Sequence, residues 1–253
     1  LFIIFCKPFF INFFIHFFFT IFIFYDIVNT NMSSFSKNFL VLLDHISSPT
    51  GIVFPVASLI LKIREACDAR ILVDGAHAAG MLPLRLQDFG ADYYTGNCHK
   101  WMCAPKGTAF LYVRPEHQSK LHPLTISHGM NRPVSDSTRF RLEFDWIGTR
   151  DLTGFLTLPM LIGYLADVSS QGWDGIMARN RALAVEARDL IGQELGLEPP
   201  CPVDMIGSLA TVCLPNAKRT TFTDYHAVDP LKEVLRPVSY THLRAHETLR
   251  YLV

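Results

Sequence analysis

The stretch Ile71–Trp101, ILVDGAHAAGMLPLRLQDFGADYYTGNCHKW, decides the fold of this chain. It holds two short runs that are typical of buried strands, and polar residues follow each run. Asp74 closes the first run, and Lys100 follows the second after a short loop. Two strands joined by a crossover lie parallel, so their carboxyl ends share one edge of the sheet. We therefore expect Asp74 and Lys100 to face a common ligand site at that edge.

Strands and helices alternate along the chain around this stretch. The continuous apolar run from Phe39 to Leu43 is typical of a strand that is buried on both faces. Such alternation predicts the α/β class, with a mostly parallel sheet flanked by helices. The other predicted elements are helices over 56–68, 152–168 and 173–195, strands over 71–73, 92–95, 108–113 and 205–214, a short helix or irregular crossover over 82–89, and loops over 116–150.

The overall composition excludes several classes of protein. The 253 residues carry 23 Lys+Arg and 23 Asp+Glu, so no net charge draws the chain to nucleic acid. Six scattered cysteines without a CxxC pair argue against a disulfide framework and against a zinc site. This cysteine usage suits a reducing compartment, and we expect a cytoplasmic protein.

Both ends of the chain differ in composition from its middle. Residues 1–25 hold 11 of the 20 phenylalanines, the bias that AT-rich non-coding DNA gives when it is translated. We interpret residues 1–38 as a leader foreign to the protein; a membrane anchor, which would make the protein membrane-associated, is the alternative. Residues 237–253 contain SYTHLRAHET, which resembles translated sequencing adaptor, so we expect an adaptor-derived tail.

An acid and a lysine at one sheet edge suit pyridoxal 5′-phosphate, which needs a lysine for its Schiff base and a carboxylate beside its pyridinium nitrogen. We predict Lys100 as the Schiff-base lysine and catalytic residue and Asp74 as the pyridinium partner. His77 lies on the same turn and is predicted to reach the ring hydroxyl. Asn97 and His99 flank the lysine and are predicted to donate to the phosphate.

Each of these residues has a simpler structural interpretation when it is taken alone. Asp74 after a strand is commonly a helix cap, and a lone His77 is most often a core or surface residue. Lys100 next to Trp101 is able to lie along the indole ring. The combination of an acid, a histidine and a lysine in this order favours the cofactor site. No metal site is predicted, because the histidines lack metal-ligand spacing.

Several motifs resemble the class V aminotransferase family of fold-type I pyridoxal-phosphate enzymes. These motifs are ILVDGAHAAG, YYTGNCHKW, DHISSPTGIVFP, CAPKGTAFLYV and DWIGTRD, and they look most like the isopenicillin N epimerase-like and cysteine desulfhydrase-like branch. The resemblance implies the same roles for Lys100 and Asp74 and places Ser48 near the ring hydroxyl. It also implies that Thr149 contacts the phosphate of the other subunit in a homodimer with shared active sites.

The resemblance is incomplete at both ends. It implies part of the large cofactor-binding domain over residues 39–165 and part of a small C-terminal domain over residues 166–236. The family's glycine-containing phosphate loop, its ring-stacking residue and its carboxylate-binding arginine have no counterpart that we can assign. We also interpret Cys201 as a structural residue and not as a nucleophile.

The predicted function is that of a pyridoxal-phosphate enzyme fragment acting on a small amino acid. A C–S lyase or desulfhydrase, or an epimerase-like enzyme, fits the resemblance best. A class V aminotransferase is one alternative, and a catalytically silent gene product or scaffold segment is another. No nucleic acid or membrane partner is expected.

Overall fold

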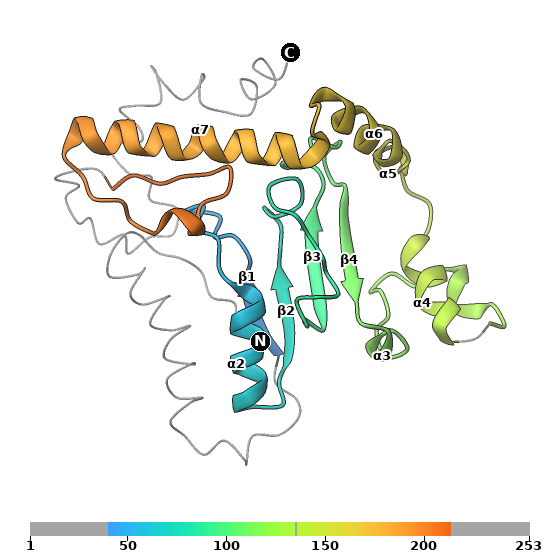
Figure 1. The fold of residues 1–253 in the computed structure, drawn as a ribbon. Coiled ribbons are helices and arrows are strands. Elements are labelled where there is room, and N and C mark those ends of the chain that lie inside the picture. Colours follow the sequence, from blue (N-terminus) through green and yellow to red (C-terminus); the bar gives the residue numbers. More distant parts are fainter. Residues whose placement is uncertain (1–39, 135, 214–253) are drawn as a thin grey trace, which may run out of the picture.

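A four-stranded sheet forms the centre of the computed structural model, which describes residues 40–134 and 136–213 (Figure 1). Its strands lie in chain order, β1-β2-β3-β4, with β1 to β3 parallel and β4 antiparallel to β3. The predicted α/β class with a mostly parallel sheet is therefore confirmed. The strands are β1 (Leu40–Asp44), β2 (Arg70–Asp74), β3 (Tyr93–Asn97) and β4 (Ala109–Val113).

The helix α2 (Val56–Ala66) covers one face of the sheet and closes the main core. It begins after Pro55 and ends where Cys67 turns extended. The buried helical residue Ile60 packs in one cluster with the buried strand residues Ile71 and Val73. Burial of an isoleucine or valine side chain stabilises the fold by about 1.5 to 3 kcal/mol. This cluster fixes β2 between its two parallel neighbours.

The crossover between β2 and β3 is irregular, which was one of the two predicted alternatives. Residues 82–89 form turns and no helix. The chain leaves β2 through Gly75, whose missing side chain makes room for the Tyr94 ring. A Cβ atom at Gly75 would lie 2.2 Å from atoms of that ring. The glycine therefore lets the backbone pass close to β3 at the carboxyl edge of the sheet.

The region 116–150, which was predicted to be loop-rich, contains helices. They are α3 (Pro115–Gln118), the 3-10 helix η2 (His128–Asn131) and α4 (Asp136–Asp145). The sequence hides α4 because polar residues dominate it. Its inward side is nevertheless packed: the rings of Phe140 and Phe144 are 4.6 Å apart, and buried Glu143 accepts a 2.7 Å hydrogen bond from His122.

The helix predicted over 152–168 is divided in two, α5 (Thr153–Leu156) and α6 (Leu158–Val168), and the helix predicted over 173–195 is confirmed as α7 (Gly172–Leu195). In Figure 1, α7 lies on the side toward which β2 and β3 point. Within the described residues only Ile176 and Arg188 of α7 are buried. Leu183 and Leu190, on the apolar side expected from the sequence, stay exposed.

The predicted strand over residues 205–214 is wrong for the part that the structure describes. The segment starts with the 3-10 helix η3 (Val203–Met205) and meets the loop after β1 instead of entering a sheet. The Val53 amide donates to the Met205 carbonyl at 2.9 Å, and Ile206 forms an isolated bridge with Ile52. The apolar residues of this segment predicted a strand, but within the described residues the segment pairs only through one isolated bridge.

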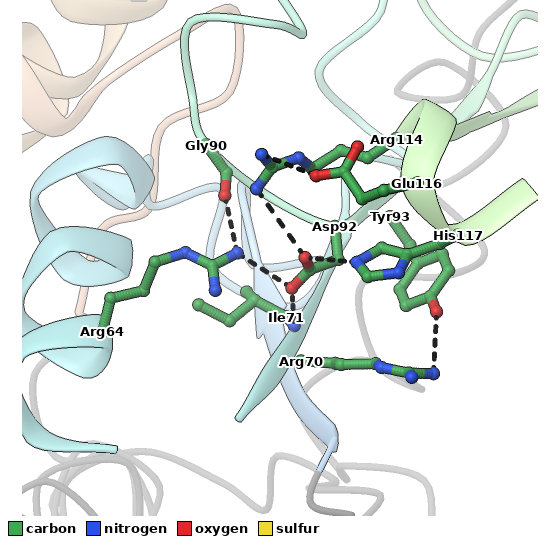
Figure 2. Close-up of polar contacts among 9 residues, drawn as sticks. All are labelled: Arg64, Arg70, Ile71, Gly90, Asp92, Tyr93, Arg114, Glu116 and His117. Carbon is green, nitrogen blue, oxygen red and sulfur yellow. Dashed lines mark hydrogen bonds and ion pairs between the residues drawn. The ribbon is translucent and has the colours of Figure 1, made fainter. Parts of the chain in front are cut away.

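Asp92 and the charged side chains around it form a cluster at the amino end of β3 (Figure 2). This is the opposite end of the sheet from Asp74, which ends β2. Asp92 is 3% exposed and accepts hydrogen bonds from Arg64 at 2.9 Å, from the Ile71 amide at 2.7 Å and from His117 at 2.8 Å. Arg114 lies 3.9 Å from the same carboxylate. These bonds lower the pKa of Asp92 although burial opposes them. The cluster ties α2, β2 and α3 together.

The domain boundaries at residues 39–165 and 166–236 stay predictions. The interpretations of residues 1–38 and 237–253 concern residues outside the described part. Within residues 40–134 and 136–213, no helix has the length and apolar character to cross a membrane.

Candidate active site

Three predicted site residues meet at the carboxyl edge of the sheet. The Lys100 Nζ atom lies 3.1 Å from the His77 Nε2 atom, and the Ser48 Oγ atom lies 3.3 Å from the same nitrogen. They come from the loops after β3, β2 and β1, respectively. Because these strands are parallel and adjacent, their loops converge, as the sequence predicted.

Asp74 is the last residue of β2 and begins the turn that carries His77. Its Oδ1 atom accepts a 2.9 Å hydrogen bond from the Ala76 amide, and the Gly75 amide donates to the Thr95 carbonyl at 2.8 Å. Asp74 therefore acts as a cap through one oxygen, as the simpler interpretation predicted, but it caps a turn and not a helix. No hydrogen bond to Oδ2 occurs within the described residues.

Lys100 lies in the loop, residues 98–108, that joins β3 to β4. The amides of Cys98 and His99 both donate to the Thr108 carbonyl, at 3.0 and 3.2 Å, and the Cys103 amide donates to the Lys100 carbonyl at 3.1 Å. The lysine is only partly exposed. The backbone therefore holds the start of the lysine side chain, and its amine is directed to His77.

The electrostatics of the edge favour a neutral imidazole at His77. Burial, and secondly the charge of Lys100, lower the pKa of His77, while Asp74 raises it. Asp44 pairs in register with Asp74 across β1 and β2. Loss of solvation and the charge of Asp74 raise the pKa of Asp44 to about 6. The His77 imidazole is therefore mostly uncharged at neutral pH.

The remaining predicted residues do not join the hydrogen bonds of this centre within the described part of the chain. Asn97 is the last residue of β3 and pairs in register with Ala109. The His99 Nδ1 atom donates to the Thr108 carbonyl at 2.9 Å, because a carbonyl only accepts. Thr149 is exposed in the loop between α4 and α5. The phosphate roles of Asn97, His99 and Thr149 stay predictions.

The sequence interpretation missed the role of Trp101. Its Nε1 atom donates to the His77 Nδ1 atom at 3.3 Å, so it belongs to the hydrogen-bonded group around His77. The alternative interpretation, in which Lys100 lies along the indole ring, did not include a hydrogen bond from Trp101 to His77. The position of a tryptophan next to the lysine was visible, but the sequence carries no signal that its N–H would meet a histidine 24 residues earlier.

The sequence interpretation also missed the contact between two buried residues near Asp74, His45 and Tyr94. His45 follows β1, is 6% exposed, and its Nδ1 atom lies 2.7 Å from the Tyr94 hydroxyl. Burial lowers the pKa of His45 to about 4. Burial and the nearby Asp74 raise the pKa of Tyr94. Both side chains are therefore uncharged in the folded protein, which keeps the core under the site free of charge.

An acid and a lysine on neighbouring strand ends of a mostly parallel sheet are the arrangement of fold-type I pyridoxal-phosphate enzymes. Residues 26–207 match the family model described as aminotransferase class-V. The chain belongs to the class V aminotransferase family, and the family uses pyridoxal 5′-phosphate.

Named relatives agree with this assignment. The chain is 31% identical over 216 residues to an L-cysteine desulfhydrase of Arabidopsis thaliana, which covers 82% of this chain and 46% of the relative. It is 34% identical over 186 residues to an isopenicillin N epimerase of Streptomyces clavuligerus, which covers 68% of this chain and 45% of the relative. The chain therefore spans less than half the length of these two relatives.

Solved structures support the fold. A cysteine desulfurase from Thermococcus onnurineus NA1 superposes with a TM-score of 0.56 at 22% identity, over 70% of this chain and 44% of that chain. An alanine–glyoxylate aminotransferase from Nostoc sp. has a TM-score of 0.51 at 18% identity, over 71% of this chain and 47% of that chain.

The residues at the edge fit pyridoxal phosphate by their chemistry. Lys100 supplies an amine, Asp74 supplies a carboxylate with one oxygen outside any described hydrogen bond, and His77 and Ser48 supply polar groups between them. Within the described residues no group of three His, Cys, Asp or Glu side chains forms a metal site. The donor set therefore suits an organic cofactor with an aldehyde and a basic ring nitrogen.

Proposed function

We propose that this chain provides the lysine-bearing part of a pyridoxal-phosphate enzyme that acts on a small amino acid. The observation that carries the proposal is the 3.1 Å contact between Lys100 Nζ and His77 Nε2, one strand away from the free oxygen of Asp74. A lysine held beside a neutral imidazole is suited to bond to an aldehyde, because only the amine form is nucleophilic.

The residues of the edge divide the work of such an enzyme. When bound, pyridoxal phosphate withdraws electrons from the substrate Cα atom. Asp74 holds the proton on the ring nitrogen, since a carboxylate ion favours the charged pyridinium. Lys100 would hold the cofactor through its amine and would be the general base placed to accept the substrate Cα proton. His77 and Ser48 donate to polar atoms of the cofactor ring and orient it.

The cysteines favour C–S lyase or epimerase-like chemistry over sulfur transfer to a protein thiol. Cys98 is buried, and burial raises its pKa. Burial is also the main reason that the pKa of Cys201 is raised. A nucleophilic cysteine requires a lowered pKa. We therefore propose that these two thiols do not take sulfur from the substrate and that Lys100 is the reacting residue.

We further propose a homodimer in which Thr149 completes the phosphate site of the other subunit. Exposed apolar side chains gather in the loops that precede and follow α4: Leu124 is 106% exposed, Ile126 74% and Trp146 46%. Trp146 lies three residues before Thr149. Sedimentation velocity tests this proposal: the wild type should sediment as a dimer and Ile126→Asp as a monomer, whereas a monomeric wild type contradicts it.

Attachment of the cofactor to Lys100 is the decisive test. The purified chain is incubated with pyridoxal phosphate, the lysine-bound form is reduced with borohydride, and the modified peptide is identified by mass spectrometry. We expect modification at Lys100, its loss in Lys100→Ala and its retention in Lys106→Ala, since Lys106 is an exposed lysine of the same loop region. Equal modification of Lys106 and Lys100, or none at all, refutes the proposal and favours a catalytically silent chain.

The location of the protein also stays a proposal. The five described cysteines, Cys67, Cys98, Cys103, Cys201 and Cys213, are all free. Free thiols suit a reducing compartment such as the cytoplasm. Cell fractionation with an antibody to the chain tests this, and recovery in the membrane pellet contradicts it.

A further inference from the structure

His77 is the point at which three side chains of the site meet. Its Nε2 atom contacts Lys100 Nζ at 3.1 Å and Ser48 Oγ at 3.3 Å. Its Nδ1 atom accepts from the Trp101 indole N–H at 3.3 Å. The three contacts use both ring nitrogens, so the position of the imidazole proton decides which contacts are hydrogen bonds.

The indole leaves only one neutral form of His77 compatible with its own bond. A tryptophan N–H is a donor and has no acceptor lone pair, so the Nδ1 atom must carry a lone pair and no proton. The imidazole is mostly neutral at neutral pH, because burial, the largest cause, lowers its pKa. A neutral imidazole with a bare Nδ1 carries its proton on Nε2. The Nε2–H group therefore faces Lys100 and Ser48.

This proton position selects the form of Lys100 that bonds to His77. A lysine ammonium has three donors and no acceptor, so it forms no hydrogen bond with an Nε2–H group. The amine form has a lone pair and accepts from Nε2–H. The opposite tautomer would present a bare Nε2 atom, which accepts from the ammonium. The two tautomers of His77 thus present opposite groups to the lysine, a donor in one and an acceptor in the other.

We propose that Trp101 is a positioning residue that fixes the Nε2–H tautomer of His77, so that the imidazole presents a donor to Lys100 and to the cofactor. The proposal rests on the proposed function insofar as Lys100 is the cofactor-bearing lysine. Trp101 follows Lys100 directly, so one loop positions both the lysine and the indole N–H that fixes the proton of His77. Trp101 touches neither the substrate nor the reacting atoms in this role.

Nitrogen NMR of the cofactor-free protein tests the assignment directly. Long-range proton–nitrogen spectra of histidine-labelled protein separate bare from protonated ring nitrogens, and the His77 signals are identified by their loss in His77→Gln. We expect a bare Nδ1 and a protonated Nε2 in the wild type. Trp101→Phe keeps an aromatic ring but removes the donor, and we expect the Nε2–H form to lose about fivefold in its ratio to the Nδ1–H form, the effect of one ordinary hydrogen bond.

A matched variant controls for the loss of any indole N–H. Trp173 donates to the Ile162 carbonyl at 3.1 Å, between α7 and α6, and not to His77. Trp173→Phe should therefore leave the His77 signals unchanged. An Nδ1–H tautomer in the wild type overturns the proposal, and this outcome is measurable even if Trp101→Phe does not fold. An unchanged tautomer ratio in a folded Trp101→Phe overturns it as well.

A second measurement separates this inference from the proposed function. The rate at which pyridoxal phosphate bonds to Lys100, followed by its visible absorbance, should fall about fivefold in Trp101→Phe and stay unchanged in Trp173→Phe. If the cofactor never bonds to Lys100 while the tautomer results hold, the proposed function fails and the role of Trp101 stands. If the cofactor bonds equally fast in both variants, the role of Trp101 fails and the proposed function stands.

Discussion

Two aspartates mark opposite ends of the same sheet and differ in how their charge is compensated. Asp92, at the amino end of β3, accepts from Arg64, from the Ile71 amide and from His117, with Arg114 close by (Figure 2). Asp74, at the carboxyl end of β2, accepts only from the Ala76 amide within the described residues. Asp92 is held by several donors, whereas one oxygen of Asp74 accepts no hydrogen bond from the described residues.

The difference separates a structural cluster from a binding site. A buried charge that is fully paired stabilises the arrangement around it, and removing one partner leaves the others uncompensated. A charge whose partners are few is costly to the fold and available to a ligand. Under the proposed function we therefore expect a bound cofactor to stabilise the edge around Asp74, His77 and Lys100, and not the cluster around Asp92.

Removal of each carboxylate should show the contrast most strongly. We expect Asp92→Ala to lower the free energy of unfolding by about 4 kcal/mol, because Arg64 and His117 lose their buried partner. Asp74→Ala is the matched variant and should cost less than about 1 kcal/mol in the absence of cofactor. Urea unfolding followed by circular dichroism measures both. Equal losses in the two variants would remove the basis of the comparison.

The pH dependence of stability should reveal the neutral core under the site. The pKa of His45 falls from 6.5 to about 4 on folding, so between these two pH values His45 is protonated in the unfolded chain and neutral in the folded chain. This contribution is complete above pH 6.5 and is lost as the pH falls to about 4. The loss amounts to at most about 3 kcal/mol.

Asp44 acts in the opposite direction and supplies the control. Its pKa rises from 3.8 to about 6 on folding, so its contribution is present below pH 3.8 and is lost as the pH rises through about 6. His45→Gln should therefore remove the gain in stability between pH 4 and 6.5, and Asp44→Asn should make that gain steeper. Urea unfolding across this range checks both, and an unchanged pH profile in His45→Gln contradicts the prediction.

The close contact between Gly75, which follows β2, and the Tyr94 ring of β3 predicts a smaller effect on stability. Gly75→Ala places a Cβ atom 2.2 Å from the Tyr94 ring, and such overpacking costs about 2 kcal/mol. Gly163→Ala in α6 is the control, because its Cβ atom meets nothing within 4 Å and alanine gains up to about 1 kcal/mol over glycine in a helix. Thermal unfolding should thus shift down in the first variant and up in the second. A neutral Gly75→Ala would show that the ring moves aside.

The smallest effect is expected at Ser48. Its side chain is exposed and its contact with His77 is 3.3 Å, so Ser48→Ala should change the free energy of unfolding by no more than about 0.5 kcal/mol. Its influence should appear in cofactor binding, measured by equilibrium dialysis of pyridoxal phosphate, as a modest loss of affinity. A large loss of stability would place Ser48 with the structural residues.

The strands and helices with simple apolar patterns were predictable from the sequence. β1, β2, β3 and α2 follow apolar runs or helical spacing, because their residues bury one face against the same cluster. The helix α4 was missed because its burial rests on a few side chains, among them Phe140 and Glu143, set in a polar segment. The segment after Met205 was misassigned because an apolar run does not specify whether a strand partner exists.

The sequence by itself determined the mostly parallel sheet and the meeting of Asp74, His77 and Lys100 at one edge. Local patterns and the geometry of a strand crossover are enough for that, because parallel neighbours end at the same side. Only the tertiary structure decided that the Trp101 N–H reaches His77 and that Arg64 and His117 both bond to Asp92. Hydrogen bonds between distant residues depend on side-chain direction within a packed fold, and a one-dimensional pattern does not contain that direction.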